Sequence, residues 1–580
     1  MPADRVKVGL ALSGGGHRAA FFHIGVLAKL AEQGILRRIE VISTVSGGSI
    51  VGALYYLHVK NLLEQKPDRE IVDADFIEIV RKVERDYRLA AAKNVRGAAW
   101  SSVRANARMV KPTYTRTDRV GELYERHFYA GAWGARPKVN GRILMRDLLI
   151  KPSGHEGDAP FDPYTENANR SAPVPILLLE ATTMNTGHNW RFEAKYLGEP
   201  PRQHGAAGQE RADVDKNLAF ERTAWSELPE ACRDFPLGSA VVSSACFPGG
   251  FPPMQIPGLP PEQKTVIDLI DGGVHDNQGI EGLRDCGCTH LLISDGSGQM
   301  PELPRPSTRL PAVLGRVVSI YGESERQERL LDALAEDTTF LVHLQTGLPA
   351  ETQSLSLKAK AAPAPLTMTE CGVDVEVQRA LANIRTDLDA FCEVEAWALM
   401  ANAYQLAGKV LDQRPQVAGL GHKAVIAGWA FDPVRPLLGQ PNAEFLKVLH
   451  AGKERFFKPA RMLRGGLAAV YTALLVAGIA LAVVGWRLFT PHGTISYCLA
   501  IGAAVLLGIY GKSTSTYIRP LAILIFDAVI PALLVVPLYA LAWLQLGAGS
   551  WWLRIGRLSR RGVLGVAPPA EVTQPGTPGV

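Results

Sequence analysis

The sequence predicts an α/β fold, in which a parallel sheet is flanked by helices, followed by a C-terminal region of membrane-spanning helices. Two observations predict the sheet and its helices. Two short apolar runs near the N-terminus each lead through a glycine turn into a helical pattern, and consecutive strand–turn–helix units are typical of parallel sheets covered by helices. A third observation, three long apolar segments after residue 460, predicts the membrane region.

The first unit is an apolar strand over Val6–Leu12, a glycine turn, and a helix over residues 18–33 with apolar residues at helical spacing. The second is a β-rich run over Val41–Val45, the turn Ser46-Gly47-Gly48, and a helix over residues 49–59. Further strands are predicted over 175–181, 266–270 and 290–294, and further helices over 61–130, 309–336 and 375–412.

Size and composition narrow the class of protein. The 580 residues exceed one ordinary domain, and 47% hydrophobic residues supply material for a core. A net charge of +5 is too small to predict a nucleic-acid partner. The seven cysteines follow neither a disulfide framework nor zinc-site spacing, which predicts reduced thiols and a cytosolic soluble part. The first apolar run is too short for a signal peptide.

Ser46 lies between a predicted strand and a predicted helix. A serine on such a sharp turn is held exposed above the sheet, where its hydroxyl can act as a nucleophile. The N–H of Gly47 can then help to bind an oxyanion. The usual signature is G-x-S-x-G, and Thr44 stands here in place of the first glycine. Taken alone, the motif also fits an ordinary serine–glycine turn.

A glycine-rich turn, Gly14-Gly15-Gly16-His17-Arg18, follows the first strand and opens a helix. Consecutive glycines at a helix start direct unpaired N–H groups at an anion, either a nucleotide phosphate or an oxyanion. The Gly-Lys-Ser/Thr ending of a P-loop is absent, and so is the last glycine of a dinucleotide-binding fingerprint. An oxyanion hole beside Ser46 fits better, because adjacent parallel strands end at the same edge of a sheet.

Asp271-Gly272-Gly273 ends another predicted strand, and Asp295-Gly296 ends the next. A carboxylate at Asp271 could accept the serine proton or orient a base. Asp-Gly-Gly alone is more often a plain turn. His275 is a candidate third partner, although the position also fits a polar loop histidine.

These motifs, in this order, resemble the patatin-like phospholipase family over roughly residues 6–300, and the stretch 243–253 resembles a further block of it. The resemblance implies a three-layer α/β/α fold and a Ser–Asp dyad without metal or organic cofactor. Ser46 would be the nucleophile and Asp271 the base. Gly14, Gly15, Gly16 and Gly47 would form the oxyanion hole. Thr44 and Ala19 depart from the family pattern, and Thr44 is expected to crowd the turn.

The expected activity is cleavage of acyl esters of the phospholipase A or lysophospholipase type, with membrane lipids as substrate and surroundings. A transacylase or neutral-lipid lipase using the same dyad, and a lipid-binding scaffold that does not cleave, are the alternatives. Arg18 and His17 are candidate substrate-binding residues, Arg18 as a contact to a phosphate head group and His17 by shaping the hole. The basic stretch 93–119 is either a solvated face or a contact to an anionic leaflet.

The C-terminal region contains two uncharged runs, over 467–486 and 494–510, and a third apolar run over 521–546 that is interrupted by Asp527, Pro531 and Pro537. Each is a predicted membrane segment. Five basic residues within 453–464 precede the first run, which predicts an integral membrane protein with its N-terminal part in the cytoplasm. Four arginines within 554–561 follow the last run and favour an even number of crossings. The expected divisions are a hydrolase core over 1–300, a helical extension packed on it over 301–450, the spans over 460–552, and a tail over 553–580.

Overall fold

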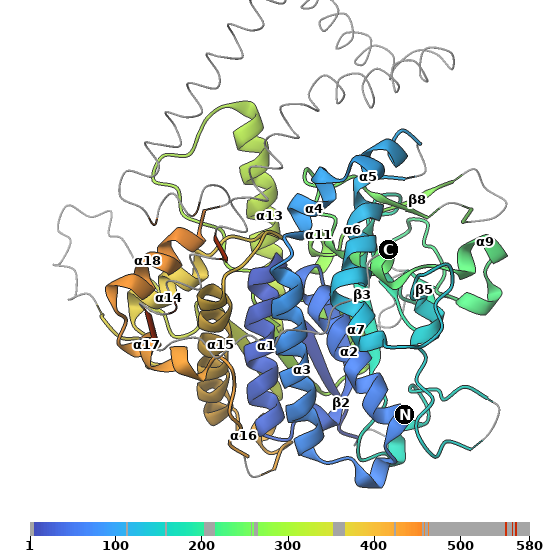
Figure 1. The fold of residues 1–580 in the computed structure, drawn as a ribbon, viewed down its shortest axis with the longest axis horizontal. Helices are drawn as coiled ribbons and strands as arrows, with labels where there is room; N and C mark the ends of the chain where they lie inside the picture. Colours follow the sequence, from blue (N-terminus) through green and yellow to red (C-terminus); the bar gives the residue numbers. More distant parts are fainter. Residues whose placement is uncertain are drawn as a thin grey trace, which may run out of the picture.

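A computed structural model gives the structure. It describes residues 5–111, 114–156, 159–201, 215–256, 258–259, 265–351, 366–422 and 425–454, with a few later positions (458, 462, 552–553, 560 and 563–564). One mixed sheet forms the centre, with strand order β10-β9-β1-β2-β3-β4-β5-β6, while β8 pairs with β3 and β7 pairs with β8. Helices cover both faces of this sheet (Figure 1).

Five strands run parallel, and the apolar runs of the sequence account for four of them. These are β1 (Val8–Leu12), β2 (Ile39–Val45), β3 (Ile176–Thr183), β9 (His290–Asp295) and β10 (Thr339–His343). Strands β1, β2 and β3 are buried along their whole length, as expected for continuous apolar runs in a sheet covered on both faces.

The remaining strands are antiparallel, so the expectation of a parallel sheet holds only for its centre. They are β4 (Asn189–Phe192), β5 (Tyr196–Gly198), β6 (Thr223–Ala224), β7 (Met254–Ile256) and β8 (Ile267–Asp271). The three-layer α/β arrangement is therefore confirmed, with an antiparallel extension on one side.

Alternate residues of the central strands face two separate hydrophobic cores, as the period of two in a strand requires. Leu10 and Leu12 face the larger core, under α1 (Gly16–Glu32), α2 (Gly47–Gln65), α3 (Asp73–Ala91) and α15 (Glu393–Gln413). Ala11 faces the smaller core, under α12 (Ile280–Asp285) and α13 (Leu310–Leu334). Helices α1 and α15 pack closely at Gly25. A Cβ at this position would lie only 2.0 Å from the carbonyl oxygen of Met400, so the contact requires glycine.

Shorter helices complete the two outer layers. They are α4 (Val95–Ser101), α5 (Val103–Arg108), α6 (Arg116–Tyr124), a π-helix (Glu125–Tyr129), α7 (Ala130–Trp133), α9 (Glu230–Arg233), α10 (Leu237–Ala245), α11 (Gly273–Asp276), α14 (Val375–Ala382), α16 (Pro415–Ala418), α17 (Arg435–Gly439) and α18 (Ala443–Gly452). The helix predicted over 375–412 is two helices, α14 and α15, because the chain between them turns at 383–392.

The region 301–450, predicted as a helical extension, contributes the edge strand β10 to the sheet. The sheet therefore continues beyond residue 300. The three predicted membrane segments lie outside the described residues. Among the residues that are described, no helix is long and apolar enough to cross a membrane.

Candidate active site

Ser46 occupies the turn between β2 and α2, with φ 51° and ψ −113°. A positive φ is costly for a residue with a Cβ and persists only where surrounding contacts enforce it. Here Gly48 donates its N–H to the carbonyl of Ser13 at 3.1 Å, and a Cβ at Gly48 would lie 2.1 Å from the carbonyl oxygen of Leu12. The two glycines after Ser46 thus let the turn press against the end of β1.

A one-directional chain of hydrogen bonds holds the backbone of Ser46. Thr44 Oγ1 donates to the carbonyl of Leu178 at 2.8 Å, so it must accept from Ser49 Oγ at 3.0 Å. Ser49 must therefore accept from Ser244 Oγ at 2.8 Å, and Ser244 in turn accepts the Ser46 N–H at 2.9 Å. Such aligned chains polarise each bond in the same direction. The chain ties the strained turn to α10 and β3.

Thr44 does not crowd the turn, contrary to the sequence-based expectation. Its methyl group lies against Gly52 on α2, where a Cβ would be only 2.5 Å away, and its hydroxyl belongs to the chain just described. The Thr44 side chain needs room that a glycine at position 44 would not need. The absence of a side chain at Gly52 supplies this room. The departure from the family motif is accommodated one helical turn into α2.

The glycine loop lies directly beside Ser46, as its place after β1 predicts. A Cβ at Gly47 would lie 2.2 Å from the carbonyl oxygen of Gly16, so only glycine fits at this contact. Gly15 has φ 135° and Gly16 has φ 60°. Within the described part of the chain, the amides of Gly15, Gly16 and Gly47 have no hydrogen-bond acceptor. All three lie at helix starts, where N–H groups lack intrahelical partners.

Gly14 differs from the other predicted oxyanion-hole residues. Its N–H donates to the carbonyl of Asn277 at 3.0 Å, so it is not available to an oxyanion. A Cβ at Gly14 would lie 2.2 Å from Asn277 Oδ1 and 3.3 Å from Ser46 Cβ. Gly14 is therefore a spacer that lets Asn277 and Ser46 approach, and the predicted role in the hole is corrected.

Asp271 reaches Ser46 by an antiparallel strand. Strand β2 pairs with β3 as far as Val45 and Glu180, and β8 then pairs with β3 from Ala181 onward, with Asp271 opposite Ala181. Because β4 occupies the other side of β3, β8 lies on the same side as β2 and in line with it. The two strands meet end to end, so their last residues place Ser46 and Asp271 together.

The Asp271 carboxylate is buried and its charge is held by two hydrogen bonds. Burial raises the pKa of Asp271 to about 6, opposed by the Gly273 N–H, at 2.8 Å, and by the Ser46 hydroxyl. No ion pair involving Asp271 occurs among the described residues. A carboxyl with a pKa near neutrality, bonded to a serine hydroxyl, can exchange a proton with that hydroxyl.

Arg18 and His17 point away from the site, which corrects both as candidate substrate contacts. The Arg18 guanidinium donates to the carbonyls of Gly296, Ser297 and Ile384, and it is buried. It therefore fastens the start of α1 to the end of β9 and to the segment before α15.

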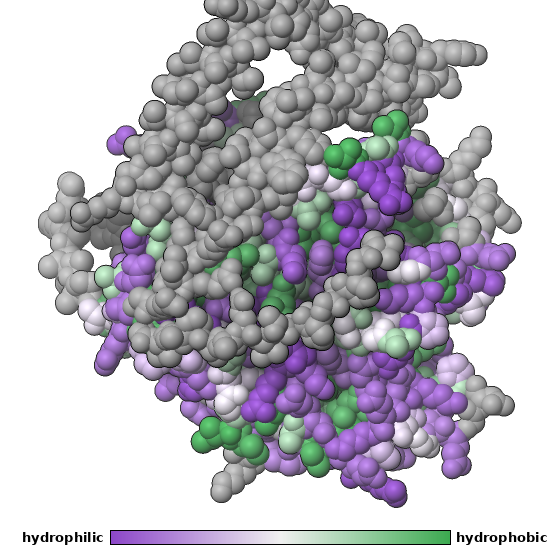
Figure 2. Space-filling view, in the orientation of Figure 1, coloured by the Kyte–Doolittle hydropathy of each residue, from purple (hydrophilic) through white to green (hydrophobic). Residues whose placement is uncertain are grey.

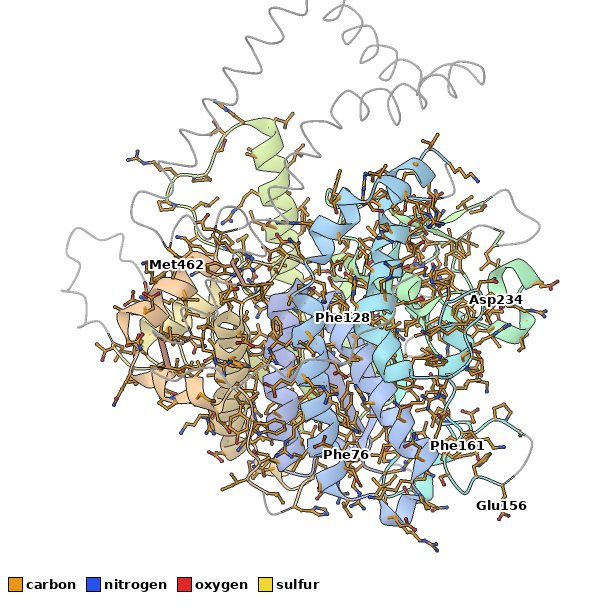
Figure 3. All side chains as sticks on the ribbon, in the orientation of Figure 1. Phe76, Phe128, Glu156, Phe161, Asp234 and Met462 are labelled. Atoms are coloured by element: carbon orange, nitrogen blue, oxygen red, sulfur yellow. The ribbon has the colours of Figure 1, made fainter. Side chains whose placement is uncertain are left out.

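His17 lies within a group of aromatic rings from Phe21, Tyr87, Phe128 and Phe391, of which Figure 3 labels Phe128 within the helical layer. Its Nδ1 bonds the Tyr87 hydroxyl at 2.8 Å. Burial lowers the pKa of His17 to about 3, so it stays neutral.

His275 is not placed as a third partner, because its Nε2 pairs with Glu281 at 3.0 Å. Two residues of the site were missed by sequence reasoning. Ser244 lay in a block noticed only as a resemblance. Tyr124 gave no signal, yet its buried hydroxyl has no hydrogen-bond partner in the described ranges. Burial raises the pKa of Tyr124, and the charge of Asp271 adds to this shift.

Residues 10–284 match the family model of the patatin-like phospholipases. These residues form a patatin-like phospholipase domain. The chain is therefore an enzyme of the lipid acyl hydrolase class. A search of curated proteins gives no match. Among solved structures, VipD from Legionella pneumophila is similar with 14% identity over 77% of this chain and 76% of that chain, at a TM-score of 0.25.

Proposed function

We propose that this enzyme cleaves the acyl esters of membrane lipids through an acyl intermediate on Ser46, with Asp271 as its proton acceptor. The observation that carries the proposal is the pairing of a serine held at positive φ on a strand-to-helix turn with a buried carboxyl that accepts its hydroxyl. Three unpaired amides beside it, at Gly15, Gly16 and Gly47, would bind the developing oxyanion.

In the first half-reaction, Ser46 Oγ attacks the ester carbonyl carbon and its proton passes to Asp271. The carbonyl oxygen becomes an oxyanion facing the three amides. As the tetrahedral intermediate collapses, the ester C–O bond breaks and Asp271 returns the proton to the leaving alkoxide, which departs as the alcohol. An acyl ester remains on Ser46.

In the second half-reaction, water attacks the acyl ester while Asp271 accepts a proton from the water. Collapse of this intermediate releases the fatty acid, and the proton returns to Ser46 Oγ. A single carboxyl therefore serves both steps, and no histidine has to take part.

Membrane anchoring by the C-terminal segments is part of the proposal. Residues on both flanks of these segments contact the chain just before and at the start of α15: Lys458 pairs with Asp389 at 2.7 Å, and Trp552 donates to Glu395 at 2.8 Å. Arg560 pairs with Glu393 at 3.1 Å. Two flanks held at one place favour an even number of crossings, with the catalytic domain on the cytoplasmic side.

The contacts of Lys458, Trp552 and Arg560 also favour a lipid surface as the source of the substrate. Asp387, two residues before Asp389, accepts the His17 N–H at 3.0 Å through its carbonyl, next to the glycine loop. The flanks of the predicted spans are thus held near the edge of the sheet that carries Ser46. An anchor leaving from this edge would keep the site close to the lipid surface, which favours a lipid ester as substrate.

A fluorophosphonate probe tests the nucleophile. The full chain in neutral detergent should be labelled, and Ser46→Ala should lose the label while keeping its thermal unfolding midpoint. Ser243→Ala is the matched control, because the Ser243 hydroxyl bonds the Ser239 carbonyl within α10 and this variant should still be labelled. Labelled phospholipid should yield free fatty acid rather than a new acyl lipid, which separates hydrolysis from transacylation. Absence of labelling in folded wild type would refute the proposal.

A further inference from the structure

A second pocket lies on the surface between α5, α6, the π-helix over Glu125–Tyr129 and the turn at residues 138–142. Its volume is about 620 Å³, and none of its lining residues belongs to the site around Ser46. It is large enough for a phosphate-bearing group with part of its attached skeleton.

Positive charge dominates this pocket. Two carboxylates, Glu122 and Glu125, face six basic side chains, which gives an excess of four positive charges. The basic residues are Arg104, Arg108, Arg119, Arg126, Lys138 and Arg142. A concave site lined by one sign of charge concentrates ions of the opposite sign.

Half of these cations are not neutralised by the protein. Glu122 pairs with Arg108 at 2.8 Å and with Arg119 at 3.0 Å, while Glu125 pairs with Arg142 at 2.8 Å. Within the described ranges, Arg104, Arg126 and Lys138 take part in no ion pair or side-chain hydrogen bond, and all three are exposed.

A buried donor in the pocket is also left without an acceptor. Arg119 Nε has no hydrogen-bond partner among the described residues, although a buried N–H in a folded protein normally has one. An anion in the pocket would supply acceptor oxygens to a guanidinium already oriented by its bond to Glu122.

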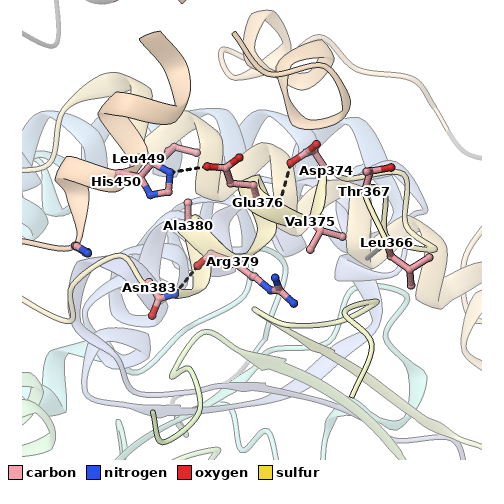
Figure 4. Close-up of a pocket in the computed structure, with 11 residues that line it drawn as sticks. Leu366, Thr367, Asp374, Val375, Glu376, Arg379, Ala380, Asn383, Leu449 and His450 are labelled. Carbon is pink, nitrogen blue, oxygen red and sulfur yellow. Dashed lines mark hydrogen bonds and ion pairs between the residues drawn. The ribbon is translucent and has the colours of Figure 1, made fainter. Parts of the chain in front are cut away.

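A pocket of similar volume, about 640 Å³, provides a comparison between α14 and α18 (Figure 4). Its two carboxylates, Asp374 and Glu376, are balanced by two cations, Arg379 and Lys453. Glu376 pairs with His450 at 3.0 Å, Arg379 pairs with Glu351, and Asp374 caps the first turn of α14. Size alone therefore does not produce an excess of unpaired charge, and the basic pocket is distinct in this respect.

Apolar side chains stand beside the basic pocket. Val103 on α5 is 71% exposed, Val110 is 67% exposed, and Trp100 on α4 is 41% exposed. Figure 2 shows hydrophobic residues next to strongly hydrophilic ones at the upper right, over α4 and α5. Exposed apolar residues beside arginines suit a surface where acyl chains and phosphate groups meet.

We propose that this basic pocket binds the phosphate group of an anionic ligand at a site separate from Ser46. The shared chemistry is a phosphate, presented either by a lipid head group or by a soluble phosphate, and the apolar side chains beside it favour the head group. The pocket is one helix away from the catalytic serine. Glu125 accepts the N–H of Gly238 at 3.0 Å on α10, the helix that also carries Ser244.

Binding can be measured by calorimetry on the full chain carrying Ser46→Ala, so that turnover does not enter and the proposed hydrolytic function is not being tested. Two probes separate the sources: monomeric dihexanoyl phosphatidic acid and inorganic phosphate. The variant replaces the three unpaired cations, as Arg104→Gln, Arg126→Gln and Lys138→Gln together. We expect its affinity for the lipid probe to fall at least tenfold, because charge-assisted phosphate contacts are lost.

The matched control replaces three exposed basic residues elsewhere, as Arg305→Gln, Arg309→Gln and Lys409→Gln. It changes the net charge equally and should bind as tightly as the parent chain. Inorganic phosphate bound as tightly as the lipid, and lost in the pocket variant alone, would support the pocket with a soluble phosphate as its ligand. An unchanged affinity in the pocket variant, an equal loss in the control, or no binding of either probe would overturn the proposal.

Discussion

Two strands of the sheet end in Asp-Gly near the same edge, and their carboxylates have opposite surroundings. Asp295 ends β9, is fully buried, and pairs with Arg326 from α13 at 2.8 Å. Asp271 ends β8 and is equally enclosed, but it is bonded to a backbone amide and to the Ser46 hydroxyl. Burial alone would raise the pKa of Asp295, but the Arg326 guanidinium outweighs it and lowers this pKa to about 2. For Asp271, burial raises the pKa to about 6.

The comparison separates a structural aspartate from one suited to proton transfer. A carboxylate paired with a buried arginine stays ionised at every physiological pH and cannot take up a proton. A carboxylate held only by neutral donors can, and a general base works best with a pKa near the operating pH. The dipeptide is the same at both strand ends, so the neighbouring cation decides the role.

The largest expected effect is the loss of activity in Asp271→Asn. We expect kcat to fall by about 10²–10⁴-fold, the usual contribution of acid–base catalysis, with an unchanged fold. Hydrolysis of a chromogenic ester by the full chain in detergent measures it.

Asp295→Asn is the matched substitution. It leaves the Arg326 charge buried without its partner, so stability should fall by about 3–5 kcal/mol in chemical denaturation. Activity per folded molecule should change little. If Asp295→Asn abolished the activity of folded protein while Asp271→Asn retained it, the assignment of the two aspartates would be wrong.

The two aspartates should also respond oppositely to pH. Because Asp271 must be ionised to accept a proton, kcat/KM should rise with pH through about 6 and then level off. The contribution of Asp271 to the stability of the fold changes with pH in the opposite direction to kcat/KM. A carboxyl with a raised pKa stabilises the fold below its unfolded pKa near 4, and this contribution is lost as pH rises through about 6.

Asp271→Asn should therefore be more stable than wild type at pH 8, by roughly 2–4 kcal/mol, and the difference should vanish near pH 4. The pKa of Asp295 is lowered in the folded protein. Its contribution to stability is therefore present above about pH 4 and is lost as the pH falls toward 2. Thermal unfolding of both variants across pH 3–8 measures this. A flat pH–rate profile between pH 5 and 7 would contradict the role of Asp271.

The sequence predicted which residue types gather at the edge of the sheet, because strand–turn–helix units place their turns there. Ser46, Gly15, Gly16 and Gly47 are close neighbours for this reason. The way in which Asp271 reaches the site could not be predicted. Nothing in residues 266–271 shows that β8 runs antiparallel to β3 and meets the end of β2. Hydrophobic periodicity indicates a strand but not its direction.

The sequence also could not show which N–H groups of the glycine motif are already bonded to other parts of the chain. Gly14 and Arg18 belong to the glycine motif, but their N–H groups are bonded to carbonyls at Asn277, Gly296 and Ile384, more than 250 residues away. The same holds for Thr44, whose fit depends on Gly52 and Leu178. A motif identifies groups that can do chemistry, whereas long-range contacts determine which of them remain available.

The smallest expected effect concerns the chain of hydroxyls that holds the backbone of the nucleophile. Ser244→Ala removes the acceptor of the Ser46 N–H and leaves Ser49 without its donor. A lost hydrogen bond to a buried group costs about 1–2 kcal/mol, so we expect kcat to fall roughly tenfold with KM unchanged. Steady-state kinetics on a soluble ester separates these two constants.

Ser243→Ala is the matched control, because the neighbouring hydroxyl bonds only the Ser239 carbonyl within α10 at 2.7 Å. It loses a buried hydroxyl from the same helix without touching the turn, so its kcat should remain at the wild-type value. A similar fall in kcat for both variants would show that α10 acts only as packing. A fall confined to Ser244→Ala would show that the strained backbone of Ser46 is held by that bond.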